Sequence, residues 1–169
     1  EFQIKKIRSD VSCKLIRGNV DTRIRKLKEG TYDAIILSYA GIKYLNLDNE
    51  ISEIFSTDQI IPSVGQGIIA LQCRDDDSEI IKVLEKINHK DTYKRAHIER
   101  NILKVLEGDC ETAIGAHSII EGDKITVEAE LFSLDGTQLF YEKKSGNIDM
   151  FKEIGTEVGK ALKIKSNNS

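Results

Sequence analysis

The sequence predicts an α/β region followed by a smaller α+β region, and three observations support this fold class. Early in the chain, apolar runs at 11–16 and 32–37 flank a segment with helical spacing, the order found in a crossover unit between parallel strands. Apolar and polar residues alternate over 125–131, as in a strand with one buried face. Apolar residues recur at helical spacing over 80–87 and 151–162.

The first region begins with a strand expected at about 11–16, which ends at Arg17. A helix should follow with Asn19 or Asp21 as its N-cap, because the side-chain oxygen of either residue accepts a hydrogen bond from a free helix amide. Gly30 stands where helices commonly end in a left-handed residue. These signals predict one helix between the two apolar runs.

The continuous apolar run at 32–37 is typical of a buried parallel strand, and a short helix is expected over 39–45. Pro62 then opens a glycine-rich turn that leads into a strand expected at 68–73. The glycines within 65–67 imitate a dinucleotide-binding fingerprint. That fingerprint requires a helix directly after it, whereas a β-rich sequence follows here, so we exclude a dinucleotide site.

The second region should contain two amphipathic helices, one starting at about 75–78 and one over 92–106. We expect Asp91 to cap the second helix and Gly108 to end it. The charged stretch 93–100 is expected to be a solvated helix face. The expected core face of this helix consists of Ala96, Ile102, Leu103 and Leu106.

An antiparallel sheet and a last helix complete the second region. Three strands are expected, at about 113–120, 125–131 and 138–144. Turn sequences at 121–123 and 135–136 would join these strands as hairpins. Only the polar tail, 165–169, is expected to be disordered. The last helix has one apolar stripe, formed by Phe151, Ile154, Val158 and Leu162.

Composition limits the class of protein. Hydrophobic residues make up 40% and charged residues 31% of the chain, and no apolar run approaches the ~20 residues of a membrane-spanning helix. The amino terminus has no apolar signal-peptide region. Three widely spaced cysteines predict free thiols and a reducing, cytoplasmic location. Because the chain lacks an initiator methionine, we expect it to be part of a longer protein.

The net charge of −3 hides an asymmetry, since residues 1–30 hold nine Lys or Arg against four Asp or Glu. This basic segment contains only one aromatic residue, Phe2, so a small polyanionic ligand suits it better than nucleic acid. His89, His97 and His117 lack the spacing of metal ligands.

Candidate site residues fall in two places. Arg17 and Arg23 bracket the start of the first long helix, where free amides favour an anion and guanidinium groups can bind carboxylates in bidentate fashion. The alternative is a pair of solvated surface arginines. Cys110 follows a helix on a loop, a position suited to a thiol that carries a group, although an ordinary loop cysteine is the alternative. Cys13 and Cys73 lie in strand-like runs and would act as small hydrophobes.

Three stretches together resemble the porphobilinogen deaminase (hydroxymethylbilane synthase) family. They are Arg17-Gly-Asn-Val-Asp-Thr-Arg23, Pro62-Ser-Val-Gly-Gln-Gly67 and Leu106–Gly115 around Cys110, in the family's order and spacing. The resemblance implies a transferase of tetrapyrrole (haem) biosynthesis, which condenses porphobilinogen head to tail into hydroxymethylbilane on a dipyrromethane cofactor. Cys110 would hold this cofactor through a thioether. Further cofactor-binding residues implied by the resemblance are Arg17, Gly18, Asn19, Arg23 and Gln66.

The resemblance also implies a domain organisation. Residues 1–61 would be part of a second domain of periplasmic-binding-like α/β fold, 62–86 a crossover segment of the first domain, and 87–169 the cofactor-bearing third domain. The missing N-terminal domain would supply the catalytic aspartate, so no catalytic residue is expected in this chain and the chain alone should be inactive. The complete enzyme would be a monomer without nucleic-acid or membrane partners. The alternative is a non-catalytic anion-binding or assembly module that keeps the fold.

Three positions depart from the family's usual pattern. Asp109 stands where a glycine normally precedes the cysteine, and Ala113 replaces a common proline. Tyr44 occupies a position that is an arginine in many members.

Overall fold

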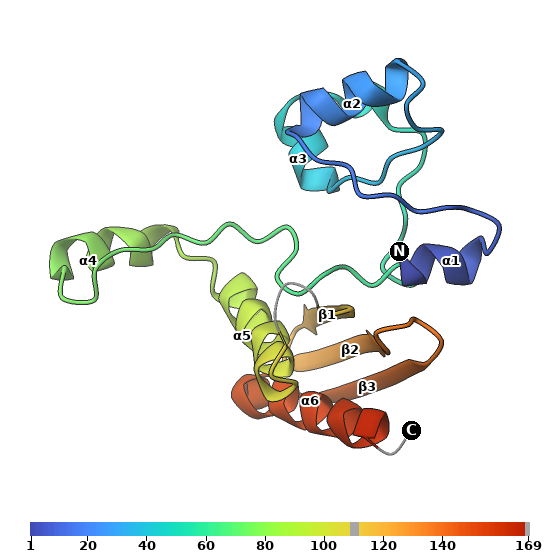
Figure 1. Cartoon of the computed structure of the whole chain (residues 1–169). Coiled ribbons are helices and arrows are strands. Elements are labelled where there is room, and N and C mark those ends of the chain that lie inside the picture. Colours follow the sequence, from blue (N-terminus) through green and yellow to red (C-terminus); the bar gives the residue numbers. More distant parts are fainter. Residues whose placement is uncertain (109–111, 168–169) are drawn as a thin grey trace. The chain divides into compact units, whose positions relative to one another are not determined.

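The structure, a computed structural model, describes residues 1–108 and 112–167 (Figure 1). It divides into two compact units, Glu1–Ile60 and Ile61–Ser169, which are described separately below. No helix in the described ranges is both long enough and apolar enough to cross a membrane.

The first unit is helical. Its elements are α1 (Phe2–Ile7), α2 (Val20–Lys28), α3 (Tyr39–Tyr44) and the 3-10 helix η1 (Asp48–Glu50). Asn19, rather than Asp21, caps α2, because its Oδ1 accepts a hydrogen bond from the amide of Thr22 at 2.9 Å. Gly30 ends α2 in the left-handed region, with a φ of 77° and an N–H that donates to the carbonyl of Leu27. The two helices predicted in this unit, one between Asn19 and Gly30 and one over 39–45, are confirmed by α2 and α3.

The strands predicted at 11–16, 32–37 and 68–73 are wrong for this chain, since the structure has no strand among residues 1–108. These segments are not paired in a sheet, and Leu15, Ile36 and Ile69 are 77%, 56% and 89% exposed. A buried parallel strand needs hydrogen-bonding neighbours and a cover on both faces. Apolar sequence alone therefore does not make these segments strands, and the predicted α/β architecture is absent from the first unit.

In the described residues the second unit contains helices and a three-stranded antiparallel sheet of order β1-β2-β3, as predicted. Its helices are α4 (Ser78–Ile87), α5 (Lys90–Val105), the 3-10 helix η2 (Ile148–Met150) and α6 (Phe151–Asn167). Its strands are β1 (Ile114–Glu121), β2 (Lys124–Phe132) and β3 (Leu139–Asn147). The predicted disordered tail is wrong for 165–167, which continue α6.

The core of the second unit lies between the sheet and the two helices α5 and α6, which cover one face of it (Figure 1). Two details of α5 differ from expectation. Its N-cap is His89, whose Nδ1 accepts from the amide of Thr92, and Asp91 lies inside the helix instead. Ile102 is fully buried, as predicted, but Ile98, which lies outside the expected core face, is fully buried as well, because the helix meets both α6 and the sheet. The fully buried apolar side chains are Ile98, Ile102, Ala116, Ile125, Val127, Ala129, Ile154, Val158 and Leu162.

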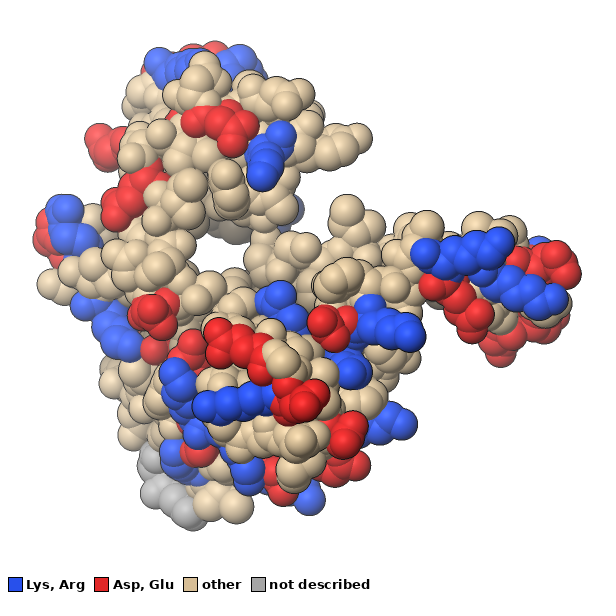
Figure 2. All heavy atoms as spheres, turned by 180° about the vertical axis from the view of Figure 1, so that it is seen from behind, with Lys and Arg blue, Asp and Glu red and all other residues tan. Residues whose placement is uncertain are grey.

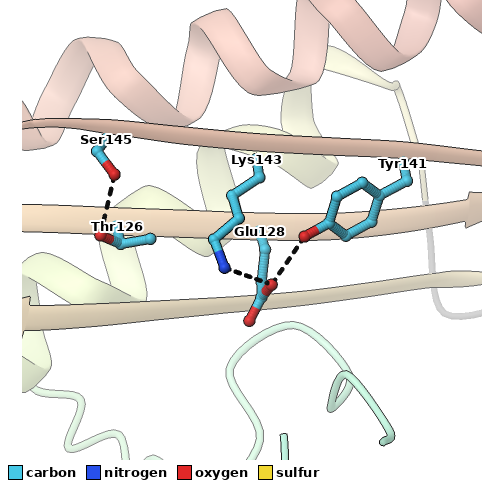
Figure 3. Close-up of polar contacts among 5 residues, drawn as sticks. All are labelled: Thr126, Glu128, Tyr141, Lys143 and Ser145. Carbon is cyan, nitrogen blue, oxygen red and sulfur yellow. Dashed lines mark hydrogen bonds and ion pairs between the residues drawn. The ribbon is translucent and has the colours of Figure 1, made fainter. Parts of the chain in front are cut away.

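The opposite face of the sheet is polar, because alternate residues of β2 point away from the helices. Figure 3 shows Thr126 bonded to Ser145 and the carboxylate of Glu128 between Tyr141 and Lys143. Oε2 of Glu128 accepts from the Tyr141 hydroxyl at 2.9 Å and lies 3.4 Å from Nζ of Lys143. These cross-strand contacts join β2 to β3 on the face without helices.

Two glycines of α6 bring it close to α5. A Cβ on Gly155 would lie 2.2 Å from the carbonyl oxygen of Ile98, and one on Gly159 would lie 2.8 Å from Cβ of Val105. Real atoms do not approach so closely, so the two helices require glycine at both positions. At Gly155 the nearest atoms all belong to the backbone of Ile98, so no flexible side chain there can move aside.

We therefore expect Gly155→Ala to lower the free energy of unfolding by at least about 1–3 kcal/mol, since overpacking forces the backbones apart. Urea unfolding followed by circular dichroism measures this change. Lys160→Ala, at an exposed position of the same helix, is the control and should stay within about 0.5 kcal/mol of the parent. A Gly155→Ala protein as stable as the control would contradict the close helix contact.

Candidate functional site

The turn before α2 is built around a glycine. Gly18 has a φ of 122°, and a Cβ there would lie 2.8 Å from Cγ2 of Thr22. Asn19 then caps the helix. The prediction that Arg17 lies at the carboxyl end of a strand is wrong, because 11–16 is not a strand. The case for an anion site here therefore rests on the helix terminus and its cations.

Two basic side chains of α2 reach back to this terminus, which Arg17 directly precedes in the chain. Nε of Arg23 donates to the carbonyl of Gly18 at 2.8 Å, and Nζ of Lys26 donates to the carbonyl of Arg17 at 3.1 Å. Lys26 was not predicted, although its spacing of three residues from Arg23 puts both on one helix face. The helix therefore folds two of its basic side chains back over the turn that begins with Arg17.

The basic residues of α2 differ in how they are neutralised. Arg25 pairs with Glu29 at 2.7 Å, and Lys28 pairs with Glu50 at 2.6 Å. The side chains of Arg23 and Lys26 instead bond to backbone carbonyls. Within the described part of the chain, no carboxylate pairs with either of them or with Arg17. These three residues, Arg17–Arg23–Lys26, are called the cationic cluster below, and in the described ranges no carboxylate balances their charge.

The glycine-rich segment 62–67 belongs to the second unit and forms two successive turns. The amide of Gln66 donates to the carbonyl of Ser63 at 3.0 Å, and that of Ile68 donates to Gly65 at 3.3 Å. The third residue of each turn is a glycine with positive φ, 71° for Gly65 and 76° for Gly67. The second turn leaves Gln66 exposed.

A buried carboxylate holds this segment against the sheet. Glu99 of α5 is only 2% exposed, and its Oε2 accepts from the amide of Gly65 at 2.9 Å. Its Oε1 accepts from the amide and the hydroxyl of Ser118 in β1, at 3.1 and 2.8 Å. The prediction of a solvated face over 93–100 is wrong at Glu99. In the sequence Glu99 stands among other charged residues, so nothing near it indicates burial. Its spacing of four residues from both Arg95 and Leu103, which puts the three on one helix face, is the only signal that relates it to a face of the helix.

The electrostatics beside Glu99 involve His117 of β1. Burial, followed by the nearby charge of Arg95, lowers the pKa of His117 below its usual range. The imidazole is therefore more often neutral at neutral pH than a solvated histidine. In the described ranges, no group of three or more His, Cys, Asp or Glu could hold a metal ion.

Cys110 and Asp109 lie outside the described residues. The structure gives their flanks: the amide of Gly108 donates to Leu103 at the end of α5, and the carbonyl of Ala113 accepts from Phe132 just before β1. Among the predicted site residues, Arg17, Gly18, Asn19 and Arg23 come together in the first unit, whereas Gln66 belongs to the second unit. Cys13 and Cys73 are free thiols.

Comparison with known proteins gives two family matches. Residues 1–82 match the model described as porphobilinogen deaminase, dipyromethane cofactor binding domain, and residues 93–164 match porphobilinogen deaminase, C-terminal domain. Together these matches take in both units of the structure and the three stretches singled out in the sequence.

Similar proteins carry the same name. The porphobilinogen deaminase of Trichlorobacter lovleyi is 41% identical over 162 residues, which cover 96% of this chain and 52% of that protein. The porphobilinogen deaminases of Syntrophobacter fumaroxidans and Coxiella burnetii are 36% and 40% identical, covering 95% and 96% of this chain and 52% and 53% of theirs. The chain thus spans about half the length of the curated relatives it matches, and it belongs to the porphobilinogen deaminase family.

Proposed function

We propose that this chain is the carboxy-terminal part of a hydroxymethylbilane synthase, a transferase that joins porphobilinogen units head to tail on a dipyrromethane cofactor. The observation that carries the proposal, beyond family membership, is the cationic cluster Arg17–Arg23–Lys26 at the start of α2. Pyrrole acetates and propionates are the multiply charged anions that such a cluster would bind. The free thiols of Cys13 and Cys73 are consistent with the reducing, cytoplasmic setting of this synthesis.

Each residue of the proposed site has a physical role. The guanidinium groups of Arg17 and Arg23 would hold carboxylates of the cofactor or growing chain, while the helix terminus favours the same negative charge. Cys110 would form the thioether to the cofactor, since a thiolate is a good carbon nucleophile. Gly18 and Asn19 would shape the binding turn, and Gln66 would contribute an amide. Each condensation releases ammonia, and water finally releases the product.

We propose the domain division stated above, with 1–61, 62–86 and 87–169 completed by an N-terminal domain that supplies the catalytic aspartate. The support is unsatisfied apolar surface in the middle segment. No residue of α4 is buried, and Ile80, Val83 and Ile87 are exposed on it. Its polar residues carry charges of both signs (Figure 2), and Glu79 pairs with Lys82. An amphipathic helix of this kind normally buries its apolar face, so we infer that the complementary domain covers it.

The first prediction concerns the attachment residue. In a chimera that joins this chain to the amino-terminal half of the Trichlorobacter lovleyi relative, Cys110→Ser should abolish a covalent dipyrromethane adduct, because a hydroxyl does not ionise at neutral pH as a thiol does. Intact-mass spectrometry measures the adduct. Cys13→Ser and Cys73→Ser are the controls and should keep it. An adduct that persists in Cys110→Ser would show that another residue holds the cofactor.

The second prediction concerns the cationic cluster. Arg17→Leu and Arg23→Leu in the same chimera should each reduce turnover at least tenfold, because loss of one partner of a desolvated charge pair costs ~2–5 kcal/mol. Arg25→Leu is the matched control, since it removes the same charge from α2, the helix of Arg23, but from a side chain already paired with Glu29. Equal rates for all three variants would refute the proposed carboxylate contacts.

The third prediction separates the enzyme from the anion-binding or assembly module. The 169-residue chain alone should release no ammonia from porphobilinogen, because charge stabilisation of the reaction needs groups positioned on both sides of the pyrrole. The chimera should release ammonia and yield uroporphyrin colour. A chimera that carries the adduct yet stays inactive would favour the non-catalytic module, and turnover by the isolated chain would place the active site within it.

A further inference from the structure

We infer that Glu99 is a positioning residue, which holds the turn that presents Gln66 in place against the sheet of the second unit. The role of Gln66 in binding cofactor rests on the proposed function, whereas the hold on the turn rests on the contacts of Glu99 alone. Glu99 itself touches neither substrate nor cofactor, so any effect on catalysis passes through the turn.

Both oxygens of the Glu99 carboxylate accept hydrogen bonds from the protein. Burial of a charged group is unfavourable unless hydrogen bonds replace its water, and here three donors do so. Two come from Ser118 and one from the amide of Gly65. Hydrogen bonds to an ionised acceptor are stronger than bonds between neutral groups, so this carboxylate links α5 to β1 and to the glycine-rich segment at once.

The other attachments of the segment lie upstream of its second turn. The carbonyl of Pro62 accepts from the amide of Ala116 at 2.9 Å, and Val64 packs against the core. Gly65 is the last residue of the segment with a bond to the sheet or to α5 among those described, and it is also the first residue of the turn that contains Gln66. Loss of the Glu99 bond would therefore free Gln66 and Gly67 while residues 62–64 stayed attached.

Two substitutions distinguish loss of the Glu99–Gly65 hydrogen bond from a general loss of stability in the second unit. Glu99→Gln keeps the shape of the side chain but replaces one acceptor oxygen by an amide group that only donates, so the three donors cannot all be satisfied. Ser118→Ala removes one hydrogen bond from the same carboxylate and leaves the Gly65 bond in place. Ser118→Ala is thus the matched control for weakened packing around Glu99.

Hydrogen exchange of the 169-residue chain, followed by mass spectrometry, tests the hold directly. We expect the amides of 65–68 to exchange at least tenfold faster in Glu99→Gln and at nearly the parent rate in Ser118→Ala, with β2 protected in both. Unchanged exchange in Glu99→Gln would overturn the inference. Equal acceleration in both variants would overturn it too, because it would reflect general loosening.

A kinetic cycle in the chimera tests whether the turn acts through Gln66. Glu99→Gln should lower kcat at least tenfold with the cofactor adduct retained, and it should have little further effect when Gln66→Ala is already present. Independent, multiplying effects would overturn the link to Gln66. An inactive parent chimera would contradict the proposed function alone, since the exchange measurement decides the hold on the turn without catalysis.

Discussion

The close approach of α5 and α6 is the constraint on which the second unit depends. Because Gly155 and Gly159 carry no side chain, the backbone of α6 lies directly against Ile98 and Ile102. This contact fixes the rotation of α5 about its axis. Once Ile98 faces α6, the next residue, Glu99, faces β1, where it meets Ser118. The packing of two helices therefore decides which polar group is buried.

The buried carboxylate then extends the fold beyond the sheet. Residues 62–67 have no regular secondary structure, yet they are held by a backbone bond to β1, by Val64 in the core and by Glu99. A segment with two positive-φ glycines has large conformational freedom when unfolded, so ordering it requires specific contacts. Glu99 supplies one of these contacts and binds Ser118 of β1 at the same time, because a carboxylate has two oxygens that accept several bonds.

The position of a basic residue along α2 decides whether its side chain meets a carboxylate or a backbone carbonyl. Along α2 the residues Arg25 and Lys28 are neutralised by nearby carboxylates, whereas Arg23 and Lys26 turn back to backbone carbonyls at the helix start. A cation bonded to a carbonyl has no negative charge beside it, whereas a cation paired with a carboxylate forms a pair with no net charge. The cluster is thus a feature of the folded helix rather than of the basic composition of residues 1–30.

The sequence by itself determined the elements that local chemistry specifies. Short-range rules predict the cap at Asn19, the glycine end of α2, the hairpins and the apolar stripe of α6. The family resemblance also came from the sequence, through three short stretches. It did not determine the strand state of 11–16 and 32–37, because a strand exists only with partners to pair with. Nor did it reveal Glu99, Lys26 or the His89 cap. Whether a charged residue is solvated, buried or paired depends on what the fold brings to it from distant parts of the chain, and only the tertiary structure decides that.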